Sequence, residues 1–129
     1  IVVSPDIKVD NGDFTFIWKT DTRLESFSVN RDTELIDANK INCQSLTIRP
    51  WLPGDRFHPF GMTGTKKISD YLIDEKVDLY TKGNQWVLVD EERIIWVCGR
   101  RINDEVKITD KTTDMRNLYS NSKYSKYGI

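Results

Sequence analysis

The chain has 129 residues, 38% of them hydrophobic and 30% charged, and its formal net charge is −1. This length predicts one domain with a buried core, and the composition is that of an ordinary soluble protein with no apolar run long enough to cross a bilayer. The near-neutral charge excludes the strongly basic footprint of an independent nucleic-acid-binding domain, so any contact with nucleic acid would use a local patch.

The N-terminal half predicts short strands. The chain begins at Ile1 without a methionine or a signal pattern, so we expect a piece of a longer, cytoplasmic protein. Residues 14–18 (FTFIW) and 26–30 (SFSVN) favour strands through their aromatic and β-branched side chains. Leu35 and Ile36 then precede a polar loop, and residues 45–48 (SLTI) predict another short strand.

Residues 66–76 (KKISDYLIDEK) predict the one principal helix, because Ile68, Tyr71 and Leu72 recur at helical spacing with no glycine or proline between them. Thr65 or Ser69 could cap its start. The apolar spacing predicts an amphipathic helix that docks on the sheet.

Residues 85–99 (QWVLVDEERIIWVCG) predict a hairpin that turns at residues 90–92. The turn lacks Asn-Gly, which favours a connection longer than two residues. Strict alternation places Trp86, Leu88, Ile94 and Trp96 on one face and Val87, Val89, Ile95 and Val97 on the other. Residues 105–109 (EVKIT) predict a last strand with Val106 and Ile108 facing the same way.

These elements predict a mostly β (α+β) fold, a layered β-sandwich-like domain with one principal flanking helix. We expect a single domain over residues 1–115 and a flexible tail over residues 116–129. Cys43 and Cys98 are far apart and match no metal-binding spacing, so each is expected to be reduced and buried.

Known catalytic patterns are missing from this sequence. Residues 61–67 (GMTGTKK) fail the spacing of a phosphate-binding P-loop, and no G-x-S-x-G motif is present. The lone His58 has no nucleophile at a recognisable spacing and is expected to bond to backbone or pack against Pro59. We therefore predict no catalytic residue, no metal site and no cofactor in this chain.

The most distinctive segment is residues 49–72 (RPWLPGDRFHPFGMTGTKKISDYL), in which prolines and glycines restrict a basic loop before the helix. Asp55 and Arg56 can pair within it. Lys66 and Lys67 at a helix start are unfavourable for the helix alone, which favours an anion such as a nucleic-acid phosphate as their partner. The alternative is that both lysines are merely solvated.

The same segment, extended to RPWLPGDRFHPFGMTGTKKISDYLIDEKV and followed by WVLVDEERIIWVCGRRINDEVKIT, resembles the C-terminal domain of tRNA(Ile)-lysidine synthetase. The resemblance covers residues 38–109 and implies a layered β-sandwich with a flanking helix, similar to a domain of the phenylalanyl-tRNA synthetase β subunit. It also implies a parent ligase that uses ATP to adenylate the wobble cytidine of tRNA(Ile), after which lysine displaces AMP.

That chemistry belongs to an N-terminal domain with an S-G-G-x-D-S loop, which this sequence lacks. The resemblance therefore implies an inactive, tRNA-positioning domain, with ATP and lysine as substrates of the parent enzyme. The implied partners are tRNA(Ile), through its acceptor-stem backbone, and the catalytic domain of the same chain; a homodimer is left open. The implied tRNA-binding residues are Arg49, Arg56, Lys66 and Lys67 in the motif, with Arg100 and Arg101 adjacent to it.

A second function class is a non-catalytic protein–protein or interdomain interaction module. Trp51, Phe57 and Phe60 in the distinctive segment favour it if they are exposed. Aromatic side chains in such a loop can instead pin it to its own core.

Overall fold

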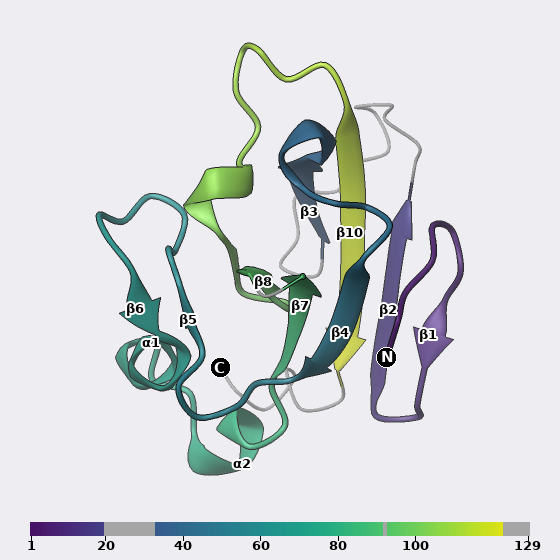
Figure 1. Cartoon of the computed structure of the whole chain (residues 1–129). Coiled ribbons are helices and arrows are strands. Elements are labelled where there is room, and N and C mark those ends of the chain that lie inside the picture. Colours follow the sequence, from purple (N-terminus) through teal and green to yellow (C-terminus); the bar gives the residue numbers. More distant parts are fainter. Residues whose placement is uncertain (20–32, 92, 123–129) are drawn as a thin grey trace.

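The computed structural model describes residues 1–19, 33–91 and 93–122. This part of the chain is mostly β, as predicted, and Figure 1 shows its elements in sequence colours. The strands are β1 Val9–Asp10, β2 Phe14–Lys19, β3 Thr33–Asp37, β4 Leu46–Pro50, β5 Arg56–Phe57, β6 Lys66–Lys67, β7 Trp86–Asp90, β8 Arg93–Val97, β9 Arg101–Ile102 and β10 Met115–Ser122. The helices are α1 Ile68–Asp74 and α2 Leu79–Lys82, with short 3-10 turns η2 Ala38–Lys40 and η3 Asp104–Val106. The predicted strand over residues 26–30 lies outside the described residues.

One sheet, called sheet I, has the strand order β1-β2-β10-β3, and all of its pairs are antiparallel. Strand β10 lies in its centre, where Leu118 is opposite Trp18 of β2 and Glu34 of β3. The expectation of a tail from residue 116 is therefore wrong for residues 116–122. Residues 123–129 lie outside the described residues.

The second sheet, sheet II, has the order β4-β7-β8-β9 and is also antiparallel. The predicted hairpin forms, but Asp90 pairs with Arg93, so only two residues connect its strands. Asp90 accepts hydrogen bonds from the Asn42 N–H (3.0 Å) and from Arg93 (3.1 Å). Asn42 thus holds the end of the hairpin from outside and Arg93 from within, and Glu91 adopts a φ of 55°. The short turn therefore forms without Asn-Gly.

A β-bulge in the same hairpin changes which side chains share a face. The register shifts between Leu88 and Val89, so that Leu88 pairs with Trp96 and Val89 with Ile94. Ile95 is the extra residue and faces the same core as Trp96, whereas Ile94 faces the opposite core with Val87, Val89 and Val97. The predicted faces are thus correct for six of the eight residues and wrong for Ile94 and Ile95.

The main core lies between the two sheets. Alternating side chains of β2, Phe14, Phe16 and Trp18, point inward from sheet I and are almost fully buried. From sheet II come Leu46, Ile48, Leu88, Ile95 and Trp96. The rings of Phe14 and Trp86 stack with centroids 4.9 Å apart and so join the two layers at one end.

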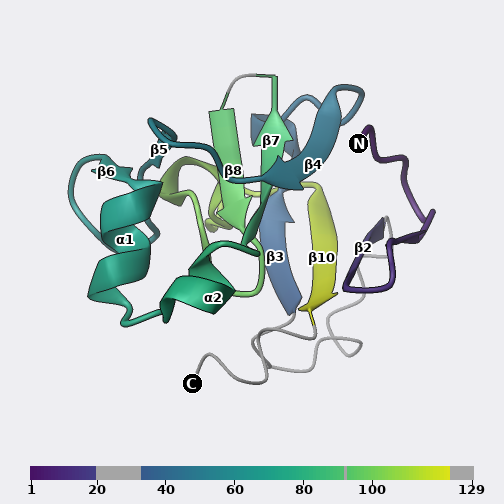
Figure 2. The same cartoon turned by 90° about the horizontal axis from the view of Figure 1, so that it is seen from below.

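Helix α1 covers the outer face of sheet II, as Figure 2 shows from below. Its buried residues are Ile68, Tyr71 and Leu72, which confirms the predicted docking face. The Tyr71 ring meets Phe57 of β5 edge-on, with centroids 5.1 Å apart. The fold therefore has three layers: sheet I, sheet II, and the β5–β6 hairpin with α1.

The start of α1 differs from the prediction. Lys67 occupies the N-cap position and makes no side-chain capping bond, so neither Thr65 nor Ser69 caps the helix. The Ile68 N–H donates instead to the Asp55 carbonyl at 2.9 Å. A backbone contact with the preceding loop replaces the side-chain cap.

The predicted strand over residues 105–109 is also wrong. The Asn103 side chain accepts from the Glu105 N–H at 2.9 Å and donates to the Ile94 carbonyl at 2.9 Å. This double contact caps the 3-10 turn η3, which buries Val106 in the main core without strand pairing.

Cys43 and Cys98 are both free thiols, and Cys98 is buried as expected, whereas Cys43 is only partly buried. Burial raises the pKa of the Cys98 thiol, which keeps it protonated. Across the described ranges, no helix combines the length and apolarity that crossing a membrane requires.

Candidate nucleic-acid interface

The distinctive basic segment folds as a loop, the β5–β6 hairpin and α1. Its first part is organised around Asp55, which accepts two hydrogen bonds from the Arg49 guanidinium at 2.8 and 3.1 Å and one from the Leu52 N–H at 2.7 Å. The expected Asp55–Arg56 pair is therefore wrong, and Arg49 is the partner. Arg49 holds the loop closed by a bidentate ion pair.

These contacts also set the charge state of Asp55. Burial acts to raise the pKa of its carboxyl group, but the hydrogen bonds from Arg49 and Leu52 and the Arg49 charge outweigh that effect and lower the pKa. Asp55 thus stays ionised in the folded state, and the loop stays tied to β4.

The β5–β6 hairpin separates the basic side chains onto two faces. Arg56 pairs with Lys67, and Phe57 pairs with Lys66. Cross-strand partners share a face, and Phe57 is buried, so Lys66 points inward while Arg56 and Lys67 point outward together. Lys66 and Lys67, both expected from the sequence to contact a phosphate, therefore lie on opposite faces of the hairpin.

The inward lysine already has a partner. Lys66 forms an ion pair with Asp74 of α1, and only 27% of its side chain is exposed. Lys67 and Arg56 are both exposed, and within the described ranges neither forms an ion pair. Like charges directly across two strands destabilise a sheet, so this outward pair costs folding stability unless an anion binds it.

Arg100 and Arg101 follow β8 and face different neighbours. Arg101 donates to the Phe60 carbonyl (3.3 Å) and to Glu75 (3.4 Å), and its guanidinium lies 5.9 Å from the centroid of the Tyr71 ring. Arg101 therefore borders the hairpin and α1. Arg100 instead donates through Nε to the side chain of Gln85 at 2.7 Å.

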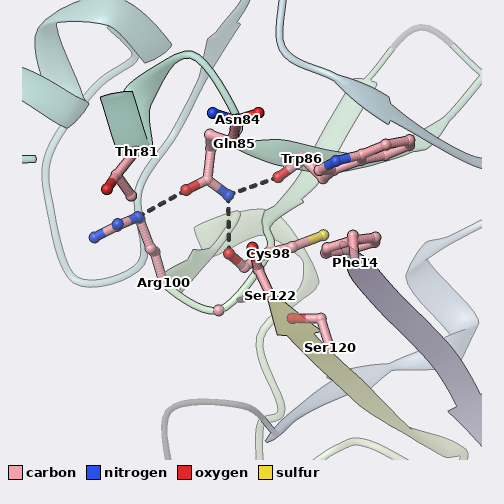
Figure 3. Close-up of a pocket in the computed structure, with 10 residues that line it drawn as sticks. Phe14, Thr81, Asn84, Gln85, Trp86, Cys98, Arg100, Ser120 and Ser122 are labelled. Carbon is pink, nitrogen blue, oxygen red and sulfur yellow. Dashed lines mark hydrogen bonds between the residues drawn. The ribbon is translucent and has the colours of Figure 1, made fainter. Parts of the chain in front are cut away.

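Gln85 and Arg100 belong to a small cavity of about 30 Å³ between the sheets, shown in Figure 3. The Gln85 amide group donates to the carbonyls of Trp86 (2.8 Å) and Cys98 (2.9 Å) and accepts from Arg100. The volume suits a single water molecule rather than a substrate. We conclude that this cavity is structural and that Gln85 within it anchors the Arg100 guanidinium.

A larger hollow of about 450 Å³ lies on the outer face of sheet I. It borders β2 and β3, which both lead into residues 20–32 outside the described part of the chain. Its lining residues are Lys8, Thr15, Ile17, Lys19, Thr33, Asn117 and Tyr119. No acid, histidine or cysteine is among these described residues, so they offer no acid–base or metal-binding set.

The three aromatic residues of the distinctive segment differ in exposure. Phe57 is buried against α1, and the Trp51 indole donates to the Lys82 carbonyl at 2.7 Å. Phe60, in contrast, is 47% exposed. Two of the three therefore pin the segment to its own core, and one presents its ring to solvent.

His58 makes the backbone contact expected of it, through Nε2 and the Met62 carbonyl. Among the residues that the structure describes, no group of three His, Cys, Asp or Glu side chains could hold a metal ion.

Comparison with protein families shows that the model of the TilS substrate C-terminal domain matches residues 46–118. Similar proteins include a tRNA(Ile)-lysidine synthase of Bacteroides thetaiotaomicron, 46% identical over 89 residues, which are 69% of this chain and 20% of that protein. Another is a tRNA(Ile)-lysidine synthase of Parabacteroides distasonis, 39% identical over 83 residues, covering 64% of this chain and 19% of the relative. The chain spans about a fifth of the length of these curated relatives.

A solved structure described as the crystal structure of a TILS C-terminal domain has the same fold. Its TM-score is 0.70 at 19% identity, and the match covers 86% of this chain and 85% of that one. The layered sandwich expected from the sequence resemblance is thereby confirmed.

Proposed function

The chain belongs to the TilS substrate C-terminal domain family, and we propose that it is the tRNA-positioning domain of an ATP-dependent tRNA(Ile)-lysidine synthetase. The proposed parent enzyme adenylates the wobble cytidine of tRNA(Ile) with ATP and then joins lysine to it in the cytoplasm. ATP and lysine bind the catalytic domain of that enzyme. This chain holds the tRNA and carries out no chemical step.

The observation that carries the proposal is the outward pair of Arg56 and Lys67. Both cations are exposed on a hairpin that α1 fixes to sheet II, and their mutual repulsion is relieved when a phosphate lies between them. Phosphates of an RNA backbone carry the charge that such a pair requires.

The rigidity of the segment supports the same role. Asp55 ties the loop to Arg49 of β4 and, through its carbonyl, to the start of α1. A surface that is already ordered loses less conformational entropy when a partner binds. Each phosphate contact on this ordered segment therefore adds more affinity than the same contact on a flexible basic tail would.

The other basic residues take different places in this proposal. Lys66 on the inward face of the hairpin and Arg101 at its border with α1 can exchange their partners Asp74 and Glu75 for a phosphate. Arg49 acts indirectly by holding the loop, whereas Arg100, whose guanidinium is oriented by Gln85, is a separate contact. The proposed tRNA contact is the acceptor-stem backbone, and the catalytic domain of the same protein is the second partner.

The test is a salt titration of tRNA binding by the enzyme that contains this chain. Each lost phosphate contact lowers the log–log salt slope, so Arg56→Ala with Lys67→Ala should flatten the slope by roughly one to two units. A matched control removes two cations elsewhere, with Lys40→Ala and Lys111→Ala, and should leave the slope near the wild-type value. Equal slopes for wild type and the Arg56/Lys67 variant would contradict the proposal.

A second candidate function, an interdomain interaction module, is favoured by exposed apolar side chains on helices α1 and α2. Ile73 of α1 is 59% exposed, and Leu79 and Tyr80 of α2 are 86% and 68% exposed. An apolar interface responds little to salt, whereas phosphate contacts weaken steeply. The same titration therefore separates the two functions.

A further inference from the structure

Phe60 is the feature of the hairpin that phosphate binding leaves unexplained. It lies in the connection between β5 and β6 and is 47% exposed, and its neighbour Met62 is 37% exposed. An exposed aromatic ring loses the hydrophobic stabilisation that Phe57, three residues earlier in the chain, gains from burial. The ring is thus placed where it can meet a partner.

The backbone around Phe60 is fixed by its neighbours. The Phe60 N–H donates to the Ile102 carbonyl (2.9 Å), and the Gly61 N–H donates to the Asp104 carboxylate (3.1 Å). The bond from Gly61, assisted by Lys107, lowers the pKa of Asp104, which stays ionised as the acceptor. Gly61 adopts a φ of 81°, a conformation that glycine tolerates best. The exposure of Phe60 therefore comes from a defined loop conformation.

The backbone at Phe60 lies near both a cation and an ionised carboxylate, since Asp104 accepts from the N–H of the next residue, Gly61. Arg101 donates to the carbonyl of Phe60 itself, and the outward pair of Arg56 and Lys67 stands at the base of the same hairpin. No acidic residue occurs between positions 56 and 67 of the sequence. Cores of protein–protein interfaces are depleted of charged residues, whereas single-stranded nucleic acids bind where aromatic rings alternate with cations.

We infer that Phe60 is a stacking platform for an unpaired nucleobase of the RNA whose phosphates contact Arg56 and Lys67. This inference rests on the proposed function and adds the nucleotide feature that the hairpin recognises. Bases inside a duplex have their faces covered by neighbouring pairs, so the ring meets a base only at an end, a bulge or a loop. Stacking involves the π-face that every base has, so the contact selects unpaired structure rather than sequence.

The experiment compares a blunt RNA duplex with the same duplex carrying an unpaired extension, each titrated against the full 129-residue chain. The variants are Phe60→Ala, Phe60→Leu and Phe60→Trp. Leucine keeps apolar area without a π-face, and tryptophan keeps the π-face. Circular dichroism confirms the fold of each variant.

Wild type and Phe60→Trp should bind the extended duplex more tightly than the blunt one. Phe60→Ala and Phe60→Leu should both lose about 5- to 150-fold in affinity for the extended duplex, the change expected for one stacked base. Their salt slopes should stay at the wild-type value, because no phosphate contact is removed. Emission of the added tryptophan should be quenched by the extended duplex more than by the blunt one.

Two results would overturn the inference while leaving the proposed function intact. One is a wild-type preference for the extended duplex that all three variants retain. The other is full affinity in Phe60→Leu with loss only in Phe60→Ala, since that pattern marks aliphatic packing of the kind a protein partner provides. Failure of the proposed function looks different: the Arg56/Lys67 double variant then keeps the wild-type salt slope.

Discussion

Arg56 and Lys67 are direct cross-strand partners that share the outward face of the β5–β6 hairpin, while Lys66 faces inward to Asp74. The two lysines are adjacent in sequence, but β geometry sends their side chains to opposite faces. The surface that an RNA would meet therefore combines one residue from before the glycine-containing loop with one from after it.

Reversing one charge of this pair should raise the stability of the fold and lower the affinity for tRNA. Lys67→Glu replaces a repulsive cross-strand pair with an attractive one, so the free energy of unfolding should rise by about 0.2–1 kcal/mol. The same change places a carboxylate where a phosphate is proposed to lie, so tRNA affinity should fall. Urea denaturation and a binding titration measure the two effects, with Lys111→Glu as the control. A variant that is less stable than wild type would contradict the proposed register.

Leu72 should be essential for the packing of α1 on sheet II. It is fully buried between α1 and sheet II, so Leu72→Ala should lower the free energy of unfolding by about 2–5 kcal/mol. Ile73, its neighbour, is 59% exposed, and Ile73→Ala should change that free energy by less than about 0.5 kcal/mol. Denaturant unfolding of both variants checks the assignment, and similar losses at the two positions would refute it.

Asp55 should contribute stability that depends on pH. Its folded-state pKa lies below the unfolded value, so the contribution is fully present above the unfolded pKa and is lost as the pH falls through the folded pKa. Asp55→Asn should cost about 1.5–3 kcal/mol at neutral pH, because the hydrogen bonds of a charged acceptor are weakened. The difference from wild type should shrink in acid. Unfolding measured from neutral pH to below the unfolded carboxyl pKa tests this, and a constant difference would exclude the Arg49 pair as its cause.

The chain on its own should be catalytically silent. The described residues contain no metal-binding group of three side chains, and the sequence contains no phosphate-binding loop. Incubation with ATP, lysine and tRNA(Ile) should release no AMP above a protein-free blank. Release of AMP by the pure chain would disprove the assignment of all chemistry to another domain.

The fold was most predictable where one element carried a strong periodic pattern of apolar residues. Ile68, Tyr71 and Leu72 at helical spacing identified both α1 and its buried face. Strand β10 was missed because its sequence, MRNLYSNS, is polar and buries only Leu118 and Ser120. Its place in the sheet is set by pairing with distant strands. The bulge at Ile95 was missed for a related reason, since an inserted residue among apolar neighbours leaves no local pattern.

The candidate site was predictable in composition but not in geometry. The basic residues of the segment could be named from sequence, but which of them are exposed depends on the register of strands only two residues long. Such strands offer no alternation from which a face can be inferred. Asp55 was expected to pair with its neighbour Arg56, yet β5 directs Arg56 outward, and Arg49 on β4 reaches the carboxylate instead.

The position of β10 also has a consequence for biosynthesis. Strands β2 and β3 do not pair with each other; both pair with β10, which is made after every other described strand. Until the ribosome has added residues 115–122, the nascent chain exposes two unpaired strand edges and the apolar side chains of β2. Such edges are the sites at which strands of other chains add. Sheet I can therefore be completed only after residues 115–122 have been synthesised.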